Sequence, residues 1–230
     1  MDEGQQRKVI RWTENHRELT PADVNTAGVS FLLGRWVVIS AKTTNFAANF
    51  CKMRKITNQE LGRLTPEEFK QADKIPVVVV LDNVRSMSNI GAFFRTADAF
   101  AIEKIILCGI TATPPNREIH KTALGAEQTV EWSYEPTTLA AVEALTEQGY
   151  QVWAVEQVEG SVMLQDFRME QGCKYAMVFG NEVAGVDQAV VDKCCGAVEI
   201  PQRGTKHSIN VSVSGGVVLW SLFCEYQKLL

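Results

Sequence analysis

Val77-Val78-Val79-Val80-Leu81 is an unbroken apolar run of mostly β-branched residues. A short run of this kind, without polar alternation, predicts a strand that is buried on both faces of a parallel sheet. Directly after it, apolar residues between Ile90 and Ala101 fall at helical spacing and predict a helix with one apolar face. Because a strand followed by a helix is the repeating unit of α/β domains, this stretch sets the fold class.

The same alternation of strand and helix signals continues toward the C-terminus. Further strands are predicted at 104–108, 151–156, 175–179 and 197–200. Further helices are predicted at 137–148, 187–194 and 209–229. The sequence therefore predicts an α/β fold, a parallel sheet with helices on both faces.

The part of the chain before the apolar run is less regular. A strand is expected at 36–40, and Thr65, Pro66 and Glu68 have the spacing of an N-cap, a first-turn proline and a capping-box glutamate. The weak periodicity before residue 53 divides the chain into an N-terminal extension of uncertain order, 1–52, and a domain at 53–230.

Composition excludes several classes of protein. The 230 residues are 46% hydrophobic and 22% charged, which is typical of a globular chain and not of a disordered one. No apolar run reaches the ~18 residues of a membrane span, and no secretory signal is recognised, so we expect a cytoplasmic protein with no membrane partner. The six cysteines form no C-x-x-C pair and have no metal-ligand spacing with histidine, so no metal is expected. A net charge of −4 excludes binding of nucleic acid over the whole surface and leaves only local basic groups for it.

Three polar segments follow predicted strands, where ligand sites gather in open α/β sheets. The first is Asn83-Val-Arg-Ser-Met-Ser-Asn-Ile-Gly91. Ser88 or Asn89 can cap the helix that follows. Arg95 lies on that helix, away from its apolar face, so it is either a solvated arginine or one that points into a cleft or a subunit interface.

The second segment is Phe179-Gly-Asn-Glu-Val-Ala-Gly185, in which the glycines allow backbone amides to wrap a ligand beside the carboxylate of Glu182. The third is Ile200-Pro-Gln-Arg-Gly-Thr-Lys-His-Ser-Ile-Asn-Val-Ser212, which places basic groups before a helix that Ser208 or Asn210 can cap. Such a helix start suits anions, including phosphates. Each segment alone is also compatible with an ordinary turn or cap. No G-x-G-x-x-G or P-loop motif occurs, which excludes ordinary dinucleotide and nucleoside triphosphate sites.

Together, in order and spacing, the three segments resemble the signature motifs of the SpoU (TrmH-type) RNA ribose 2′-O-methyltransferases of the SPOUT superfamily. The resemblance covers about residues 53–230. Val183 and Ala184 replace the small or glycine-containing pair often found after the glutamate, and Ile209 stands where leucine is commoner. These departures change no polar group, so they bear on the branch of the family and not on its chemistry.

The resemblance implies a Rossmann-like domain with a C-terminal trefoil knot, a homodimer, and S-adenosylmethionine as the cofactor. It assigns cofactor binding to backbone groups at Val155, Gly180, Ile200 and Ile209. It assigns catalysis to Arg95, Asn89, Glu182, Ser208 and Asn210. Arginine is a poor base, so Arg95 is expected to orient the ribose hydroxyl and stabilise charge, and the proton acceptor, Arg95 or a substrate phosphate, stays open.

The leading hypothesis is thus an enzyme that methylates a ribose 2′-OH of tRNA or rRNA. The alternatives are a non-catalytic RNA-binding or assembly protein on the same fold, and a knotted enzyme that methylates bases. Neither the RNA nor the modified nucleotide is indicated by the sequence.

Overall fold

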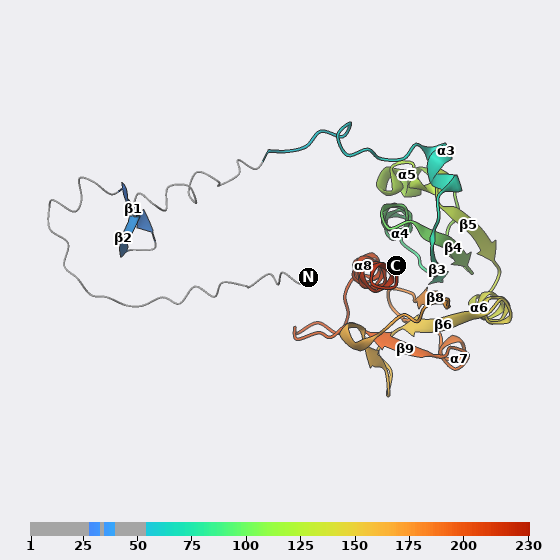
Figure 1. The fold of residues 1–230 in the computed structure, drawn as a ribbon. Coiled ribbons are helices and arrows are strands. Elements are labelled where there is room, and N and C mark those ends of the chain that lie inside the picture. Colours follow the sequence, from blue (N-terminus) through green and yellow to red (C-terminus); the bar gives the residue numbers. More distant parts are fainter. Residues whose placement is uncertain (1–27, 33–34, 40–53) are drawn as a thin grey trace, which may run out of the picture. The chain divides into compact units, whose positions relative to one another are not determined.

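The computed structural model describes residues 28–32, 35–39 and 54–230 (Figure 1). The chain divides into two compact units, Met1–Gly62 and Arg63–Leu230. In the first, β1 (Gly28–Leu32) and β2 (Arg35–Ile39) form an antiparallel pair in which Gly28 lies opposite Ile39. The strand expected at 36–40 is thereby confirmed as β2. Most of the N-terminal extension proposed at 1–52 lies outside the described residues, and its boundary stays a prediction.

The second unit is built on one sheet, in the order β5-β4-β3-β8-β6-β9-β7, whose neighbouring strands all run parallel. Its strands are β3 (Ile75–Asp82), β4 (Ile102–Cys108), β5 (Glu131–Glu135), β6 (Tyr150–Val155), β7 (Val162–Met163), β8 (Lys174–Phe179) and β9 (Gly196–Glu199). Its helices are α3 (Pro66–Gln71), α4 (Met87–Ala99), α5 (Arg117–Ala123), α6 (Thr138–Glu147), α7 (Gln188–Val191) and α8 (Val211–Gln227), with single 3-10 turns at η2 (Ala126–Gln128) and η3 (Leu164–Asp166). The predicted α/β fold with a parallel sheet is confirmed.

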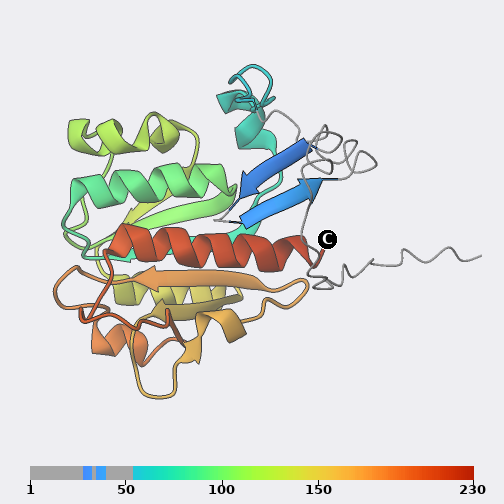
Figure 2. The ribbon, with the colours of Figure 1, turned by 90° about the vertical axis from the view of Figure 1, so that its left-hand side faces the viewer.

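Helices cover both faces of this sheet, with α4, α5 and α8 on one side and α6 and α7 on the other (Figures 1 and 2). The apolar run of β3 explains why. Val77, Val79 and Leu81 point into the cluster beneath α4 and α8, while Val78 and Val80 point into the cluster beneath α6. All five side chains are buried, as expected for a central parallel strand.

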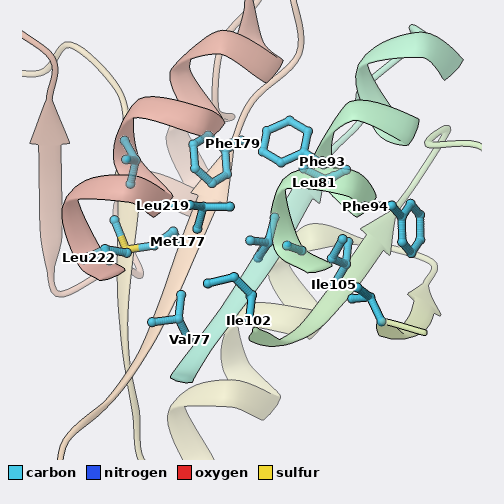
Figure 3. Packing of buried hydrophobic residues seen from close by; sticks show 14 of the residues in the cluster. Val77, Leu81, Phe93, Phe94, Ile102, Ile105, Met177, Phe179, Leu219 and Leu222 are labelled. Carbon is cyan, nitrogen blue, oxygen red and sulfur yellow. The ribbon is translucent and has the colours of Figure 1, made fainter. Parts of the chain in front are cut away.

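The larger cluster joins the helices that carry two of the three polar segments. Figure 3 shows Phe93 of α4 beside Phe179 of β8, and their ring centroids are 5.0 Å apart. Gly215 of α8 faces the same ring, because a Cβ there would lie 2.2 Å from Phe93. Burial of these large side chains contributes ~2 kcal/mol each and fixes α4 and α8 against the end of β8.

Several local predictions are confirmed and others are wrong. Thr65 caps α3 with the predicted capping box to Glu68. The cap of α4 is Ser86, and not Ser88 or Asn89, because the Ser86 side chain accepts from the amide of Asn89. The helix predicted at 187–194 is shorter, Gln188–Val191, because the amide of Cys195 turns away to donate to the Val152 carbonyl and lead into β9.

No helix of the described ranges, 54–230 included, is both long and apolar enough to cross a membrane.

Candidate functional site

The carboxyl ends of β6, β8 and β9 open into a cavity of about 550 Å³. All four residues predicted to bind a cofactor line it: Val155, Gly180, Ile200 and Ile209. Three of the five predicted catalytic residues line it too: Glu182, Ser208 and Asn210. The parallel strands explain this convergence, since the segments that follow them must all leave from the same edge of the sheet.

The wall at Gly180 consists of backbone. A Cβ on Gly180 would lie 2.1 Å from the carbonyl carbon of Gly185 and 2.2 Å from the amide of Val186, so no larger residue fits without moving the chain. The turn closes on itself, because the amide and carbonyl of Asn181 bond to those of Gly185 at 2.9 Å in both directions. The Asn181 side chain accepts from the amides of Val183 and Ala184. This turn is therefore held in one shape by its own hydrogen bonds.

Glu156, the residue directly after β6, supports this turn and was missed in the sequence. Its Oε2 accepts from the amide of Val186 at 3.0 Å. A Cβ added to Gly185 would lie only 2.2 Å from the same oxygen, so this contact requires glycine. Gly185 also has a φ of +71°, which glycine adopts without strain. A glutamate at the end of a predicted strand resembles a solvated residue, so only its place beside the turn reveals the contact.

Glu182 joins the turn to the start of α4. Its carboxylate accepts from the amides of Arg85 at 3.1 Å and Ser86 at 3.0 Å, and from Nδ2 of Asn89 at 3.1 Å. Burial works to raise the pKa of Glu182, but these hydrogen bonds outweigh it and hold the pKa below its ordinary value. The carboxylate is thus committed to accepting hydrogen bonds and is not placed as a proton donor.

We expect Glu182→Gln to lower the free energy of unfolding by about 0.5 to 1 kcal/mol at pH 7, because an amide keeps one acceptor and loses the charge while water screens part of the loss at this exposed residue. A carboxylate with a depressed pKa stabilises the fold above its unfolded pKa, and this contribution is lost as the pH falls through the folded value. The difference between wild type and variant should therefore be constant from pH 8 to about 5 and shrink below about 4.3.

Urea unfolding across this pH range measures the effect. Glu159→Gln is the control, since Glu159 is exposed and makes no side-chain hydrogen bond within residues 54–230. A difference between wild type and Glu182→Gln that does not change down to pH 3.5 would contradict the assigned hydrogen bonds.

Asn89 connects this carboxylate to α8. Asn89 is only 8% exposed, and its Oδ1 accepts from Nδ2 of Asn210 at 3.2 Å and from Oγ of Ser212 at 3.3 Å. Asn210 in turn caps α8, with its Oδ1 accepting from the amides of Ser212 and Val213. The structure therefore brings together Glu182, Asn89 and Asn210, and adds Ser212, the last residue of the third segment, which we had not singled out.

The remaining two predicted catalytic residues lie apart from this network. Ser208 is exposed at the cavity wall and makes no side-chain hydrogen bond to any residue of 54–230. Arg95 is exposed on α4, does not line the cavity, and makes no hydrogen bond or ion pair within the described residues. The alternative in which Arg95 points into a cleft is not seen within residues 54–230. Its place at a subunit interface stays a prediction.

Within the part of the chain that the structure describes, no three His, Cys, Asp or Glu side chains gather as a metal site requires.

Most of this chain matches a known protein family. Residues 76–220, well over half of the chain, match the model of the SpoU rRNA Methylase family. The chain belongs to this family. The match includes β3 to β9 and the start of α8, and so contains every residue of the Glu182–Asn89–Asn210 network.

Several named proteins are similar to part of this chain. The 23S rRNA (guanosine-2′-O-)-methyltransferase RlmB of Neisseria meningitidis is 32% identical over 63% of this chain and 56% of its own length. A crystal structure of an AdoMet-bound rRNA methyltransferase from Sinorhizobium meliloti is 26% identical with a TM-score of 0.62, covering 73% of this chain and 62% of that one. A TrmH/SpoU tRNA modifying enzyme of A. aeolicus, 20% identical with a TM-score of 0.63 over 71% of this chain and 83% of its own, shares the fold. The chain spans less than two thirds of the length of three curated relatives, namely 61%, 66% and 56%.

Proposed function

We propose that this protein transfers a methyl group from S-adenosylmethionine to a ribose 2′-OH of tRNA or rRNA. The observation that carries the proposal is the cavity with a backbone wall at Gly180, directly beside the polar network of Glu182, Asn89 and Asn210. Family membership and the named rRNA methyltransferase from Neisseria support it. A substrate of this kind also supports a cytoplasmic location.

The cavity fits the cofactor in size and in chemistry. Its volume of about 550 Å³ lies in the range of sites for small molecules. Backbone amides and carbonyls of Val155, Gly180, Ile200 and Ile209 would hold the adenosine, and the nearby carboxylates of Glu156 and Glu199 suit a cofactor with positive charge. When bound, the sulfonium supplies an activated methyl group.

The residues of the chain would then place the acceptor. A ribose hydroxyl is a weak nucleophile, so its reaction depends on alignment with the methyl group. Asn89 and Asn210 are fixed by their mutual hydrogen bond and by Glu182, and they offer polar groups with little freedom to move. Arg95 and Ser208 would contact the RNA, with Arg95 orienting a phosphate and stabilising the charge on the ribose oxygen.

The experiment that tests this function is incubation of total RNA with the full chain and labelled S-adenosylmethionine, followed by nucleoside analysis. Label in 2′-O-methyl nucleosides is the expected result, and Asn89→Ala should lose it. Label in bases would favour a base-methylating enzyme. RNA binding without transfer would favour the non-catalytic alternative.

We also propose the C-terminal trefoil knot. Two contacts support it. The segment 200–210 returns to the carboxyl end of β6, where Nε2 of Gln157 donates to the carbonyl of His207 at 3.1 Å. Helix α8 then runs back across the sheet face beside α4 (Figure 2). Threading of this kind would hold the cavity walls together without a disulfide.

We further propose that the protein is a homodimer through the outer face of α8. Val213, Val217 and Trp220 are all exposed and recur at helical spacing, and Trp220 is 54% exposed although its ring lies against Phe100 and Phe223. Exposed apolar residues in such a stripe are typical of a protein interface. The exposed basic residues of the third segment, Arg203 and Lys206, would then face RNA from two subunits.

Trp220→Glu is expected to convert the dimer to a monomer, because a charge in the centre of an apolar interface must be desolvated. Sedimentation velocity at micromolar concentration measures this. Ile110→Glu is the matched control, since Ile110 is equally apolar, 66% exposed and away from α8. A wild-type protein that sediments as a monomer at every concentration would refute the dimer.

A further inference from the structure

A second concave surface lies outside the cavity described above, between the β4–α5 loop and the start of β5. This groove, the Trp132 groove, has a volume of about 530 Å³ and includes Pro115, Arg117, His120, Glu127 and Trp132 among its lining residues. It adjoins the helix that carries Asn89, because α5 packs on α4 where Gly91 meets Ile119, and Thr122 Oγ1 donates to the Ser88 carbonyl.

The groove contains an acceptor that lacks a donor. The Glu127 side chain is only 9% exposed, and its Oε1 pairs with Nδ1 of His120 at 2.5 Å. Its Oε2 is buried and has no partner within hydrogen-bonding geometry among the residues that the structure describes. Burial works to raise the pKa of Glu127, but the contact with His120 and the nearby amides of Glu127 and Gly125 hold the pKa below its ordinary value. Buried carboxylate oxygens are normally satisfied, because an unpaired one costs free energy. The His120 side chain is 60% exposed, so its rotation into solvent would free Oε1 for another donor.

Two other features of the groove point to the kind of ligand. Trp132 is half-buried against the core and offers the rest of its indole to the groove as a flat apolar wall. Arg117 is exposed at the rim and forms no ion pair within residues 54–230, whereas Lys121 on the same helix is paired with Glu118. The aromatic wall suits stacking of a nucleotide base, and the carboxylate suits N–H donors on the hydrogen-bonding edge of that base. The arginine suits the phosphate of the nucleotide.

We propose that the Trp132 groove binds a single-stranded guanine nucleotide of the RNA, at a place other than the methylated ribose. Guanine presents two adjacent N–H donors on its Watson–Crick edge, which suit the two oxygens of Glu127. Adenine presents an acceptor nitrogen next to its amino group and would repel the carboxylate. That the guanine nucleotide belongs to RNA rests on the proposed RNA methyltransferase function. Recognition of guanine by the Trp132 groove does not rest on that function.

The test is titration of the ¹⁵N-labelled full chain with GMP and with AMP, following the indole N–H signals. The chain has five tryptophans, and the Trp132 signal is the one that disappears in Trp132→Phe. We expect GMP to shift this signal with a Kd at least about tenfold below that of AMP, as two charge-assisted hydrogen bonds would give. Glu127→Gln should bring the two Kd values to within about twofold, because its amide donor opposes the second guanine donor.

Matched variants on α5 distinguish binding in the Trp132 groove from a general effect of changing surface charge. Glu118→Gln should keep the preference for GMP, and Arg117→Ala should weaken GMP binding while Lys121→Ala does not. Saturation with S-adenosylhomocysteine should leave GMP binding unchanged, which shows that the nucleotide is not in the cofactor cavity. Equal affinity for GMP and AMP, or a preference that survives in Glu127→Gln, would overturn the proposal.

A second arm distinguishes RNA from a free nucleotide. The pentanucleotide r(UUGUU) should shift the Trp132 signal at lower concentration than GMP, and r(UUAUU) should not. A shift with GMP but none with r(UUGUU) would overturn the RNA source. Because no arm requires methyl transfer, a protein without transferase activity could still show the guanine preference, so failure of one proposal is distinguishable from failure of the other.

Discussion

Arg95→Ala is expected to reduce methyl transfer to background, a loss of at least ~100-fold, while the thermal midpoint and the affinity for S-adenosylmethionine stay near wild type. The position of Arg95 explains why methyl transfer should fall while stability and cofactor affinity do not. Arg95 is exposed, makes no hydrogen bond or ion pair in the described part of the chain, and does not line the cavity, so its removal disturbs neither the core nor the cofactor site. Its expected role lies entirely in contacts to RNA.

Three measurements test this expectation: single-turnover methylation of RNA, cofactor binding by calorimetry, and a thermal melt. Arg63→Ala is the control for loss of one exposed arginine elsewhere. Arg95→Lys should recover only part of the activity, since an ammonium keeps the charge but not the planar pair of donors. Wild-type turnover in Arg95→Ala would remove Arg95 from the proposed mechanism, and a large drop in cofactor affinity would mean that it acts on the cavity instead.

The elements that the sequence predicted best are those whose signal is local and strong. The apolar run of β3 and the apolar face of α4 are sufficient to predict their burial, because each must be covered on the sides where it is apolar. β5 was missed, since Glu131-Trp-Ser-Tyr-Glu135 alternates between polar and aromatic residues and lies at the sheet edge, where burial is incomplete. α5 was missed because only Ile119 and Ala123 of its residues are buried.

Some features of the candidate site could also be predicted from the sequence, and others could not. The three polar segments could be recognised from residue order, but the bonds between them could not, because Asn89 and Asn210 are 121 residues apart and meet only through the packing of α4 on α8. The sequence could not reveal that Glu182 bonds backbone amides of the first segment, or that Glu156 supports the turn, since both contacts depend on strand order. No partner of Arg95 or Ser208 is seen within residues 54–230, so their contacts stay a prediction.

Gly180→Ala tests the part of the site that depends on backbone alone. The added Cβ would lie 2.1 Å from the carbonyl carbon of Gly185, and both sides of this contact are main chain, so neither can rotate away. We expect the variant to lose about 2 to 3 kcal/mol of stability, as overpacked positions do. That corresponds to a fall of about 5 to 10 °C in the thermal midpoint of a domain of this size.

Gly180→Ala should also weaken binding of the cofactor. Moving the Asn181–Gly185 turn displaces the backbone groups that line the cavity, and the loss of one or two hydrogen bonds raises the Kd for S-adenosylmethionine at least about tenfold. Gly204→Ala is the matched control, because Gly204 is in the third segment but a Cβ there has no neighbour within 4 Å. Calorimetry of both variants, with circular dichroism to confirm folding, decides the point. Folded Gly180→Ala that binds the cofactor as wild type does would show that the Gly180 backbone is not a wall of the cofactor site, and the assignment of the cavity would then have to rest on Ile200 and Ile209.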